Sequence, residues 1–233
     1  MTDFHEVYRA HATEYEAMVS VEDYEGNVPA LIQRIAPAKG KTVLDIGAGT
    51  GRLTILLAPE AAEVIAVDRA PAMLEITGER ARNAGYANVE TRIADHRSLP
   101  LPDESVDLAV AGWTFGHSTE WDADWKTEIG KSLAEAFRVL KPGARLIIFE
   151  TMGTGSETPA PPNAALAALY AWFEGDQGFT EHGWLRTDYR FETPEQGAEL
   201  TRFFFGDEMA DHILADSMTI LPECTGWWAK AKS

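Results

Sequence analysis

Short apolar segments and helically spaced apolar residues alternate along residues 40–150. The short apolar segments are Thr42–Ile46, Val64–Val67, Val89–Ile93, Val106–Ala111 and Leu146–Phe149. Segments of this length between turn residues predict buried strands. Helical spacing separates them, for example at Leu53, Leu56 and Leu57. Strands that alternate with helices predict an α/β fold with a doubly wound, mostly parallel sheet and helices on both faces.

The helices around these strands have recognisable ends. We expect helices at Glu6–Ala17, Asn27–Ala36, Pro71–Ala84 and Trp125–Leu140, and a short one from the glycine-rich turn to about Ala58. Proline favours the first turn of a helix and glycine the position after its end, as at Pro71 and Gly85. Residues 1–38 are therefore expected to form a helical N-terminal cover on a core of residues 40–150.

The alternation changes after Glu150. We expect a loop at Thr151–Pro162, a helix at Asn163–Phe173, irregular chain at Gly175–Asp188, a helix from Thr193 to about Phe205, and strands at Ser217–Leu221 and Thr225–Ala229 joined by a tight turn. Lys141–Gly143 is expected to be a turn, because proline and glycine clusters favour turns and loops. We therefore expect one domain over residues 1–233, with an insertion at 151–192 and C-terminal helices and strands at 193–233.

Composition and charge limit the possible partners. The chain has 233 residues, of which 45% are hydrophobic and 24% charged, as in ordinary globular domains. Thirty-seven acidic against twenty basic residues give a formal net charge of −17. A surface this acidic repels nucleic-acid phosphates and anionic membranes. We therefore expect neither nucleic acid nor a membrane as a partner.

Cysteine usage and the apolar stretches favour a cytoplasmic protein. Cys224 is the only cysteine, so no intramolecular disulfide forms, as is usual in a reducing compartment. Met1–Ala10 carries charges and lacks the apolar core of a signal peptide. Apolar stretches such as Val106–Trp113 are far shorter than the roughly 20 residues of a membrane-spanning helix.

A glycine-rich turn with spaced acidic residues is the sharpest chemical feature. The segment Asp45–Gly51 places three glycines directly after a strand, Asp68 closes the next strand, and Asp95 follows the third. Glycine lets the backbone approach a ligand closely, and an acid at the position of Asp68 accepts hydrogen bonds from ribose hydroxyls. The carboxyl ends of parallel strands meet at one edge of the sheet. The sequence therefore predicts a nucleotide-type ligand at that edge.

The spacing of the turn distinguishes between nucleotides. A dinucleotide fingerprint requires a third glycine where Arg52 stands. A P-loop requires Gly-Lys-Ser/Thr, which the sequence lacks. Asp45 would repel a pyrophosphate, but its carboxylate suits an ammonium group. An NAD-dependent oxidoreductase is therefore a disfavoured alternative.

These segments resemble the motifs of class I S-adenosylmethionine-dependent methyltransferases, a Rossmann-like superfamily. The similar segments are Asp45–Gly51, Val64–Leu74, Ile93–Asp107 and Leu140–Leu146, and the strand around Trp227–Trp228 is similar to the last strand of the family. The resemblance covers about residues 40–150. It implies a seven-stranded sheet with an antiparallel last strand, and S-adenosyl-L-methionine as the cofactor. No metal-ligand spacing is visible in the sequence.

The resemblance also implies which residues bind the cofactor. Gly47 and Gly49 would line the methionine moiety, Asp68 would hold the ribose, and Asp95 would accept from the adenine amino group. Tyr15 and Tyr24 are similar to tyrosines that close over the cofactor. The full implied set is Tyr15, Tyr24, Asp45, Gly47, Ala48, Gly49, Asp68, Arg69, Met73, Ala94, Asp95, His96, Ala111, Gly112 and Trp113.

Methyl transfer from a sulfonium is a displacement in which positioning supplies most of the rate effect. A base is needed only if the acceptor must lose a proton first. His117 is the candidate catalytic base, because it follows the fourth strand and histidine titrates near neutral pH. Its alternative role is a hydrogen bond to the loop or cofactor. The substrate-side candidates, many of them in the aromatic insertion, are Phe115, His117, Trp121, Tyr170, Trp172, Trp184 and Arg186.

The function expected from the sequence is methyl transfer to a small, partly apolar acceptor at O, N or C. The Asn-Pro-Pro-Tyr/Phe motif of amino-group methyltransferases is absent, and the fourth strand ends in Ala111–Thr114 instead, which disfavours DNA-adenine chemistry. The alternative is a non-catalytic, cofactor-binding partner or regulatory subunit with the same fold. The acceptor and the oligomeric state, monomer or homodimer, do not follow from the sequence.

Overall fold

The structure, a computed structural model, describes residues 10–233. Its helices are α2 (Ala12–Val19), α3 (Asn27–Ile35), α4 (Arg52–Leu57), α5 (Pro71–Asn83), α6 (Ser118–Trp121), α7 (Trp125–Val139), α8 (Ala164–Glu174), α9 (Pro194–Phe205) and α10 (Asp207–Ala215). Its strands are β1 (Thr42–Ile46), β2 (Glu63–Asp68), β3 (Val89–Ile93), β4 (Val106–Gly112), β5 (Leu140–Thr154), β6 (Glu181–Arg186), β7 (Tyr189–Arg190), β8 (Ile220–Leu221) and β9 (Glu223–Ala231). Residues 6–9 of the expected first helix, and nearly all of the segment Met1–Ala10, lie outside the described residues.

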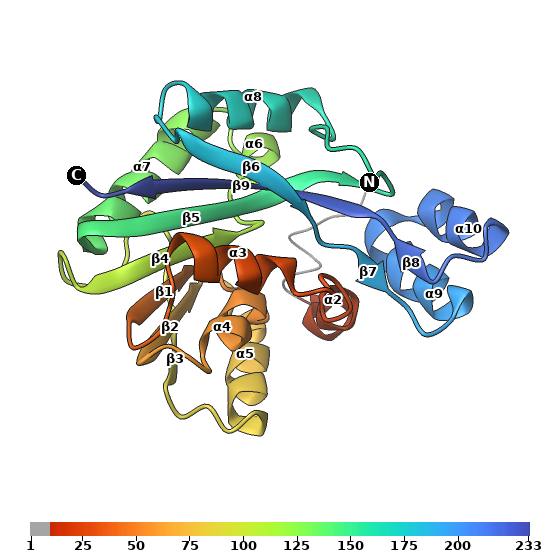
Figure 1. The fold of residues 1–233 in the computed structure, drawn as a ribbon, viewed down its shortest axis with the longest axis horizontal. Helices are drawn as coiled ribbons and strands as arrows, with labels where there is room; N and C mark the ends of the chain where they lie inside the picture. Colours follow the sequence, from red (N-terminus) through yellow and green to blue (C-terminus); the bar gives the residue numbers. More distant parts are fainter. Residues whose placement is uncertain (1–9) are drawn as a thin grey trace.

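Seven strands form the main sheet, in the order β3-β2-β1-β4-β5-β9-β6. The pairs among β1 to β5 are parallel, whereas β9 runs antiparallel to both β5 and β6. Figure 1 shows β9 between these two strands. The expected doubly wound, mostly parallel sheet is confirmed, and its antiparallel strand is the last one along the chain.

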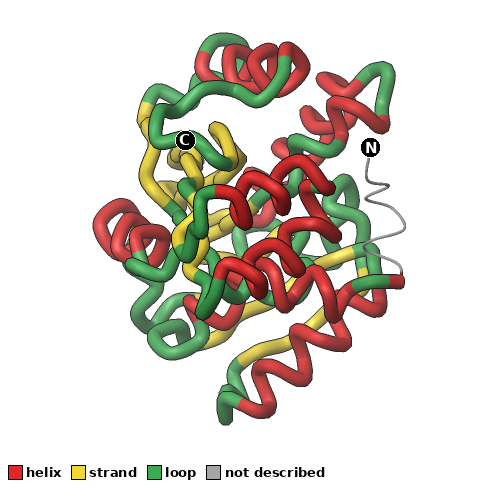
Figure 2. The backbone as a smooth tube through the Cα atoms, turned by 90° about the vertical axis from the view of Figure 1, so that its right-hand side faces the viewer, coloured by secondary structure: helices red, strands yellow, loops and turns green. Residues whose placement is uncertain are grey.

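Side chains alternate between two apolar cores, one on each face of the sheet. In β5, Leu146 and Ile148 pack with residues of α7 and α8, whereas Ile147 and Phe149 pack with residues of α3 and α4. Figure 2 shows helices on both sides of the strands. Burial on both faces explains why these strands read as continuous apolar runs. Each square ångström of apolar surface buried contributes about 25 cal/mol.

A third apolar cluster joins the N-terminal helix to the C-terminal region. Met18 of α2 packs with Tyr189 of β7, Ile213 of α10 and Leu221 of β8. Strands β7 and β8 pair only with each other, in a small antiparallel sheet beside α9 and α10 (Figure 1). This cluster therefore forms a lobe next to the main sheet, built from both ends of the described chain.

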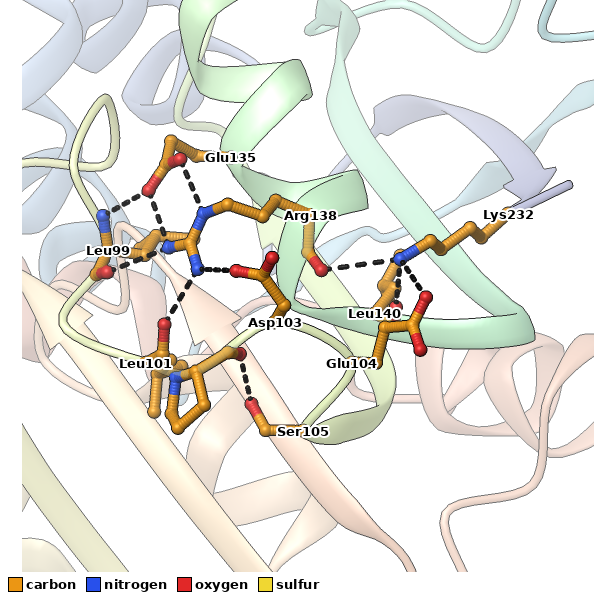
Figure 3. Close-up of polar contacts among 10 residues, drawn as sticks. Leu99, Leu101, Asp103, Glu104, Ser105, Glu135, Arg138, Leu140 and Lys232 are labelled. Carbon is orange, nitrogen blue, oxygen red and sulfur yellow. Dashed lines mark hydrogen bonds and ion pairs between the residues drawn. The ribbon is translucent and has the colours of Figure 1, made fainter.

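A polar network around Arg138 holds the connection between β3 and β4 against α7 (Figure 3). The guanidinium donates to the carbonyl oxygens of Leu99 and Leu101 at 3.0 and 2.8 Å. It also pairs with Asp103 and Glu135, each at 2.7 Å. Several carbonyl and carboxylate oxygens converge on one cation, so this connection is fixed at several points along its length.

The region after Glu150 departs most from the sequence-based expectation. Gly175–Asp188 contains the edge strand β6, because backbone pairing to β9 orders a segment without clear periodicity. Strand β5 continues through Lys141–Gly143 and on to Thr154. Ser217–Leu221 and Thr225–Ala229 do not form a hairpin, since β8 pairs with β7 and β9 enters the main sheet. Helices α6 and α10 were not predicted.

Candidate active site

The turn between β1 and α4 requires glycine for two different reasons. Gly47 has a φ of 67°, and a Cβ there would lie 2.5 Å from the side chain of Thr114. Gly49 has a φ of 56°, but a Cβ there would meet no atom within 4 Å. Positive φ strains other residues at both positions. Gly49 thus presents bare backbone to open space, as a closely bound ligand needs.

A cavity of about 270 Å³ lies against this turn, at the carboxyl ends of β1, β2 and β4; we call it the glycine-turn cavity. Eleven residues of the implied cofactor set line it: Tyr15, Asp45, Gly47, Ala48, Gly49, Asp68, Arg69, Met73, His96, Gly112 and Trp113. Tyr24, Ala94, Asp95 and Ala111 are not among its lining residues. Most of the residues implied by the resemblance therefore meet at one site.

Two carboxylates define the polar side of this cavity. Asp45 is 1% exposed and accepts a 2.6 Å hydrogen bond from the Thr54 hydroxyl. Burial raises the pKa of Asp45 to about 7. Asp68 accepts hydrogen bonds from the backbone N–H groups of Gly49 and Ala70, at 2.9 and 2.8 Å. Asp45 is thus placed to receive a cationic group, which would favour its ionised form.

Asp95, expected to accept from adenine, is occupied by its neighbour in the chain. The Arg97 guanidinium holds both carboxylate oxygens, at 2.8 and 2.6 Å, and these bonds keep the pKa of Asp95 well below its usual range. Arg97, not Asp95, lines the cavity. The centre of the Tyr24 ring lies 4.5 Å from the Cζ of Arg190. Ala111 is fully buried within the sheet.

A second cavity of about 370 Å³ adjoins the first. Apolar side chains supply much of its wall: Met18, Val19, Leu166, Phe204 and Phe205. It also contains three largely buried carboxyl groups, those of Glu22, Glu150 and Glu223. The two cavities share Tyr15, Arg52, Trp113 and His117. The two cavities are therefore neighbours that have these four residues in common.

The shared wall is built from stacked rings and one paired cation. The Cζ of Arg52 lies 3.6 Å from the centre of the Trp113 ring, and its Nη1 lies 2.7 Å from a carboxylate oxygen of Glu22. Trp113 itself has a φ of 52°. The His117 and Trp121 rings stack with centres 5.0 Å apart. Positive φ at a bulky residue is uncommon and costs energy, so it persists only where surrounding contacts enforce it.

Glu150, in β5, fixes the loop that carries His117. One of its oxygens accepts hydrogen bonds from the backbone N–H groups of Phe115 and Gly116, at 2.8 and 3.0 Å. The residue is 3% exposed, and burial raises its pKa to about 7. The loop after β4 is therefore anchored two residues before the candidate base.

The substrate-side candidates separate into two groups. His117 lines both cavities, and Trp121 lines the glycine-turn cavity. The other five line neither cavity: Phe115, Tyr170, Trp172, Trp184 and Arg186.

The structure gives these five residues other contacts. Phe115 is fully buried in the core. The Tyr170 hydroxyl donates to the Thr151 carbonyl at 2.5 Å, and Trp172 packs edge-on against Trp125. Trp184 is 48% exposed on β6. Arg186 pairs with Asp188 at 2.7 Å. Tyr170 and Trp172 of the aromatic insertion therefore pack inside the fold, and Trp184 lies largely exposed on its surface. None of the three lines either cavity, so the structure gives no support to the expectation that they cover the substrate site.

Sequence reasoning found Tyr15, Trp113 and His117 of the second cavity but missed most of its other lining residues. Phe204 and Phe205 come from α9, and Glu22 comes from the connection between α2 and α3. Glu150 and Glu223 carried a usable signal, because each is a carboxylate within an apolar strand segment. Buried carboxylates of this kind are uncommon unless paired or functional.

Comparison with solved structures agrees with the observed fold. A SAM-dependent methyltransferase from Aquifex aeolicus superposes over 94% of this chain and 96% of its own, with a TM-score of 0.58 and 21% identity. Residues 44–148 match a family profile described as "Methyltransferase domain". Together with the sheet order, these matches show that the chain has the Rossmann-like fold of this methyltransferase and that residues 44–148 are similar to a methyltransferase domain.

Curated relatives match about half of the chain. A demethylmenaquinone methyltransferase of Thermus thermophilus is 34% identical over 132 residues, which are 56% of this chain and 53% of that protein. One of Clavibacter sepedonicus is 37% identical over 121 residues, 52% of this chain and 45% of that protein. The chain thus spans about half the length of the curated relatives it matches. Within residues 10–233, no helix is both long and apolar enough to cross a membrane.

Proposed function

We propose that this protein transfers a methyl group from S-adenosylmethionine, bound in the glycine-turn cavity, to a small acceptor bound in the second cavity. The observation that carries the proposal is the wall of Tyr15, Arg52, Trp113 and His117, which both cavities share. The relatives named as demethylmenaquinone methyltransferases support the reaction class. The apolar lining of the second cavity supports a partly apolar acceptor.

The residues of the glycine-turn cavity fit the cofactor. The buried Asp45 carboxyl suits its ammonium group, the open space at Gly49 admits its methionine part, and Asp68 suits its ribose hydroxyls. The remaining lining, including Arg69, His96 and the buried Met73, would enclose its adenine end. When bound, the cofactor supplies a methyl group on a sulfonium. We do not assign the binding of the adenine amino group to Asp95, because the Arg97 guanidinium holds its carboxylate.

We further propose that His117 accepts the proton of a protic acceptor. Its place on both cavities supports this role, and the Glu150 carboxylate holds the backbone of its loop. The apolar side chains around this loop would exclude water, so that positioning supplies most of the rate effect.

The one-domain organisation and the cytoplasmic location also remain proposals. The latter is supported by the single, buried Cys224, and the charge of −17 supports a partner other than nucleic acid.

Calorimetry with S-adenosylhomocysteine tests the cofactor site. We expect saturable 1:1 binding by the wild type, and at least about tenfold weaker binding by Asp68→Ala, because two ribose hydrogen bonds are lost. Asp176→Ala, at an exposed residue beyond α8, should bind as the wild type does. Absence of wild-type binding would contradict the proposal. Methyl transfer to any member of a mixed metabolite pool would exclude the non-catalytic alternative.

A further inference from the structure

Two carboxylate oxygens of residues that line the second cavity, Glu22 Oε1 and Glu223 Oε2, have no hydrogen-bond partner among residues 10–233. Glu223 is 2% exposed and lines this cavity. The Thr151 hydroxyl donates to its Oε1 at 2.7 Å, but none of the residues from 10 to 233 donates to its Oε2. A buried acceptor without a donor costs about 1–3 kcal/mol. The geometry therefore favours a ligand that brings an N–H or O–H group to this oxygen.

The charges around the cavity narrow the chemistry of that donor. Its lining holds four acidic side chains, Glu22, Glu120, Glu150 and Glu223, against one arginine. The guanidinium of that arginine, Arg52, pairs with Glu22 at 2.7 Å and lies over the face of Trp113, while its Nη2 has no hydrogen-bond partner among the described residues. Because carboxyl groups outnumber this one guanidinium, the cavity favours a cation over an anion, and a cation there would meet carboxyl groups on several sides.

The state of Glu223 fits a cation that arrives with the ligand. Burial raises its pKa to about 8, and repulsion from the nearby Glu22 adds to the effect. Before a ligand binds, the carboxyl therefore holds a proton at neutral pH, and Oε2 accepts an N–H once a positive charge close by has driven that proton off. The rest of the wall is apolar and aromatic, including Phe204, Phe205 and Tyr189. Rings of this kind pack against a hydrocarbon body and also attract an ammonium group.

We propose that the acceptor is a small organic amine with an apolar body, and that Glu223 receives an N–H of its ammonium group in the second cavity. This inference rests on the proposed function, in which that cavity holds the acceptor. A hydroxyl donor, as in a phenol or an alcohol, would also satisfy the oxygen, but it would not balance the acidic lining. An amine and an alcohol of the same shape should therefore bind to this cavity with different affinities.

Isothermal calorimetry on the enzyme saturated with S-adenosylhomocysteine tests the preference. The probes are phenethylamine, phenethyl alcohol and phenylacetate, which share a ring and differ in charge. We expect the amine to bind at least about tenfold more tightly than either other probe. Glu223→Gln should remove most of that difference. Glu60→Gln, which removes one exposed carboxylate outside the cavity, should leave it unchanged.

A second measurement on the wild type needs no variant that might misfold. Amine binding, repeated near pH 7 in buffers of different ionisation enthalpy, should release close to one proton per amine bound, whereas the alcohol should release none. Equal or tighter binding of the alcohol or of phenylacetate, no amine binding, or no proton release would each overturn the inference. Binding of S-adenosylhomocysteine is measured first. Its loss would contradict the proposed function, whereas intact binding without amine preference would contradict this inference alone.

Discussion

The Arg52 guanidinium lies over the Trp113 ring, with Cζ 3.6 Å from the ring centre. Arg52 stands where a dinucleotide-binding loop would have its third glycine. Here it links α4 to the end of β4 through Trp113, and to the connection between α2 and α3 through Glu22. Where a dinucleotide-binding loop has a glycine that lets the backbone pack closely, this chain has an arginine. Its side chain extends from the end of the glycine turn and lines both cavities.

Removing the charge of Arg52 should destabilise the fold. The side chains of Arg52 and Glu22 are 15% and 3% exposed, so Arg52→Met leaves a buried carboxylate without its partner. We expect a loss of about 3–5 kcal/mol in the free energy of unfolding, measured by urea denaturation. Adding Glu22→Gln should recover most of it. Arg145→Met, which breaks an exposed pair with Glu181, should cost less than about 1 kcal/mol. A double variant no more stable than Arg52→Met would contradict this explanation.

The steric and conformational requirements at Gly47 can be separated. Gly47→Ala would combine positive φ with a contact to Thr114, whereas Gly40→Ala combines a similar φ of 70° with free space. We expect about 1–2 kcal/mol of destabilisation for Gly40→Ala from backbone strain alone. Gly47→Ala should lose about 1–3 kcal/mol more through overpacking, and weaken S-adenosylhomocysteine binding. Equal losses in thermal or urea unfolding would show that the Thr114 contact carries no cost.

Stability should fall as the pH rises through neutrality. The pKa values of Glu150 and Glu223 in the folded chain are raised to about 7 and about 8, above the usual value of about 4.3 in unfolded chains. Their contribution is fully present below the unfolded value and is lost as the pH rises through the folded one, because the unfolded state then binds fewer protons. Each carboxyl contributes a slope of at most about 1.4 kcal/mol per pH unit.

Urea unfolding between about pH 5 and 9 checks this slope. Glu223→Gln should flatten the upper part of the curve, since its amide does not titrate in that range. The exposed Glu60→Gln should leave the curve parallel to that of the wild type. A wild-type stability that rises over the whole range would show that these two groups do not control it.

His117→Gln should separate proton transfer from cofactor binding. If His117 accepts the acceptor's proton, kcat falls by about a hundredfold or more, and the limb of the pH profile that reports histidine ionisation is lost. The dissociation constant of S-adenosylhomocysteine should change less than about twofold, because the variant keeps a planar polar side chain beside Trp121. His212→Gln, on the exposed side of α10, provides the control. Wild-type kcat in His117→Gln would limit this residue to positioning.

Most residues that line the glycine-turn cavity were predictable, because the motifs that carry them are short and continuous in the sequence. Strand, glycine turn and helix follow one another in sequence, and a parallel sheet brings the ends of β1, β2 and β4 to one edge, so Asp45, Asp68 and Gly112 meet there. The adenine contact implied for Asp95 stays a prediction, because Arg97, two residues away, holds both carboxylate oxygens in this structure. A motif fixes where a carboxylate lies, but not what it binds.

Most of the second cavity was not predictable, because its lining residues come from segments that lie far apart in the sequence. Met18 and Glu22 lie near the start of the described chain, Leu166 in α8, and Phe204 and Glu223 near its end. Their proximity depends on the third apolar cluster and on the course of β9. Trp184 shows the same limit, since the sequence does not reveal that this aromatic residue lies largely exposed on β6.

The position of β9 also sets an order of assembly. Among the strands that the structure describes, β6 pairs only with β9, which follows it by more than thirty residues. Closing that distance costs chain entropy before any pairing returns it. The sheet from β3 to β5 can therefore collapse early, with β5 as an unprotected edge, and the late arrival of β9 caps that edge and recruits β6 in one event. Conditions that delay this event should expose β5 to pairing between molecules, so aggregation during refolding would start from there.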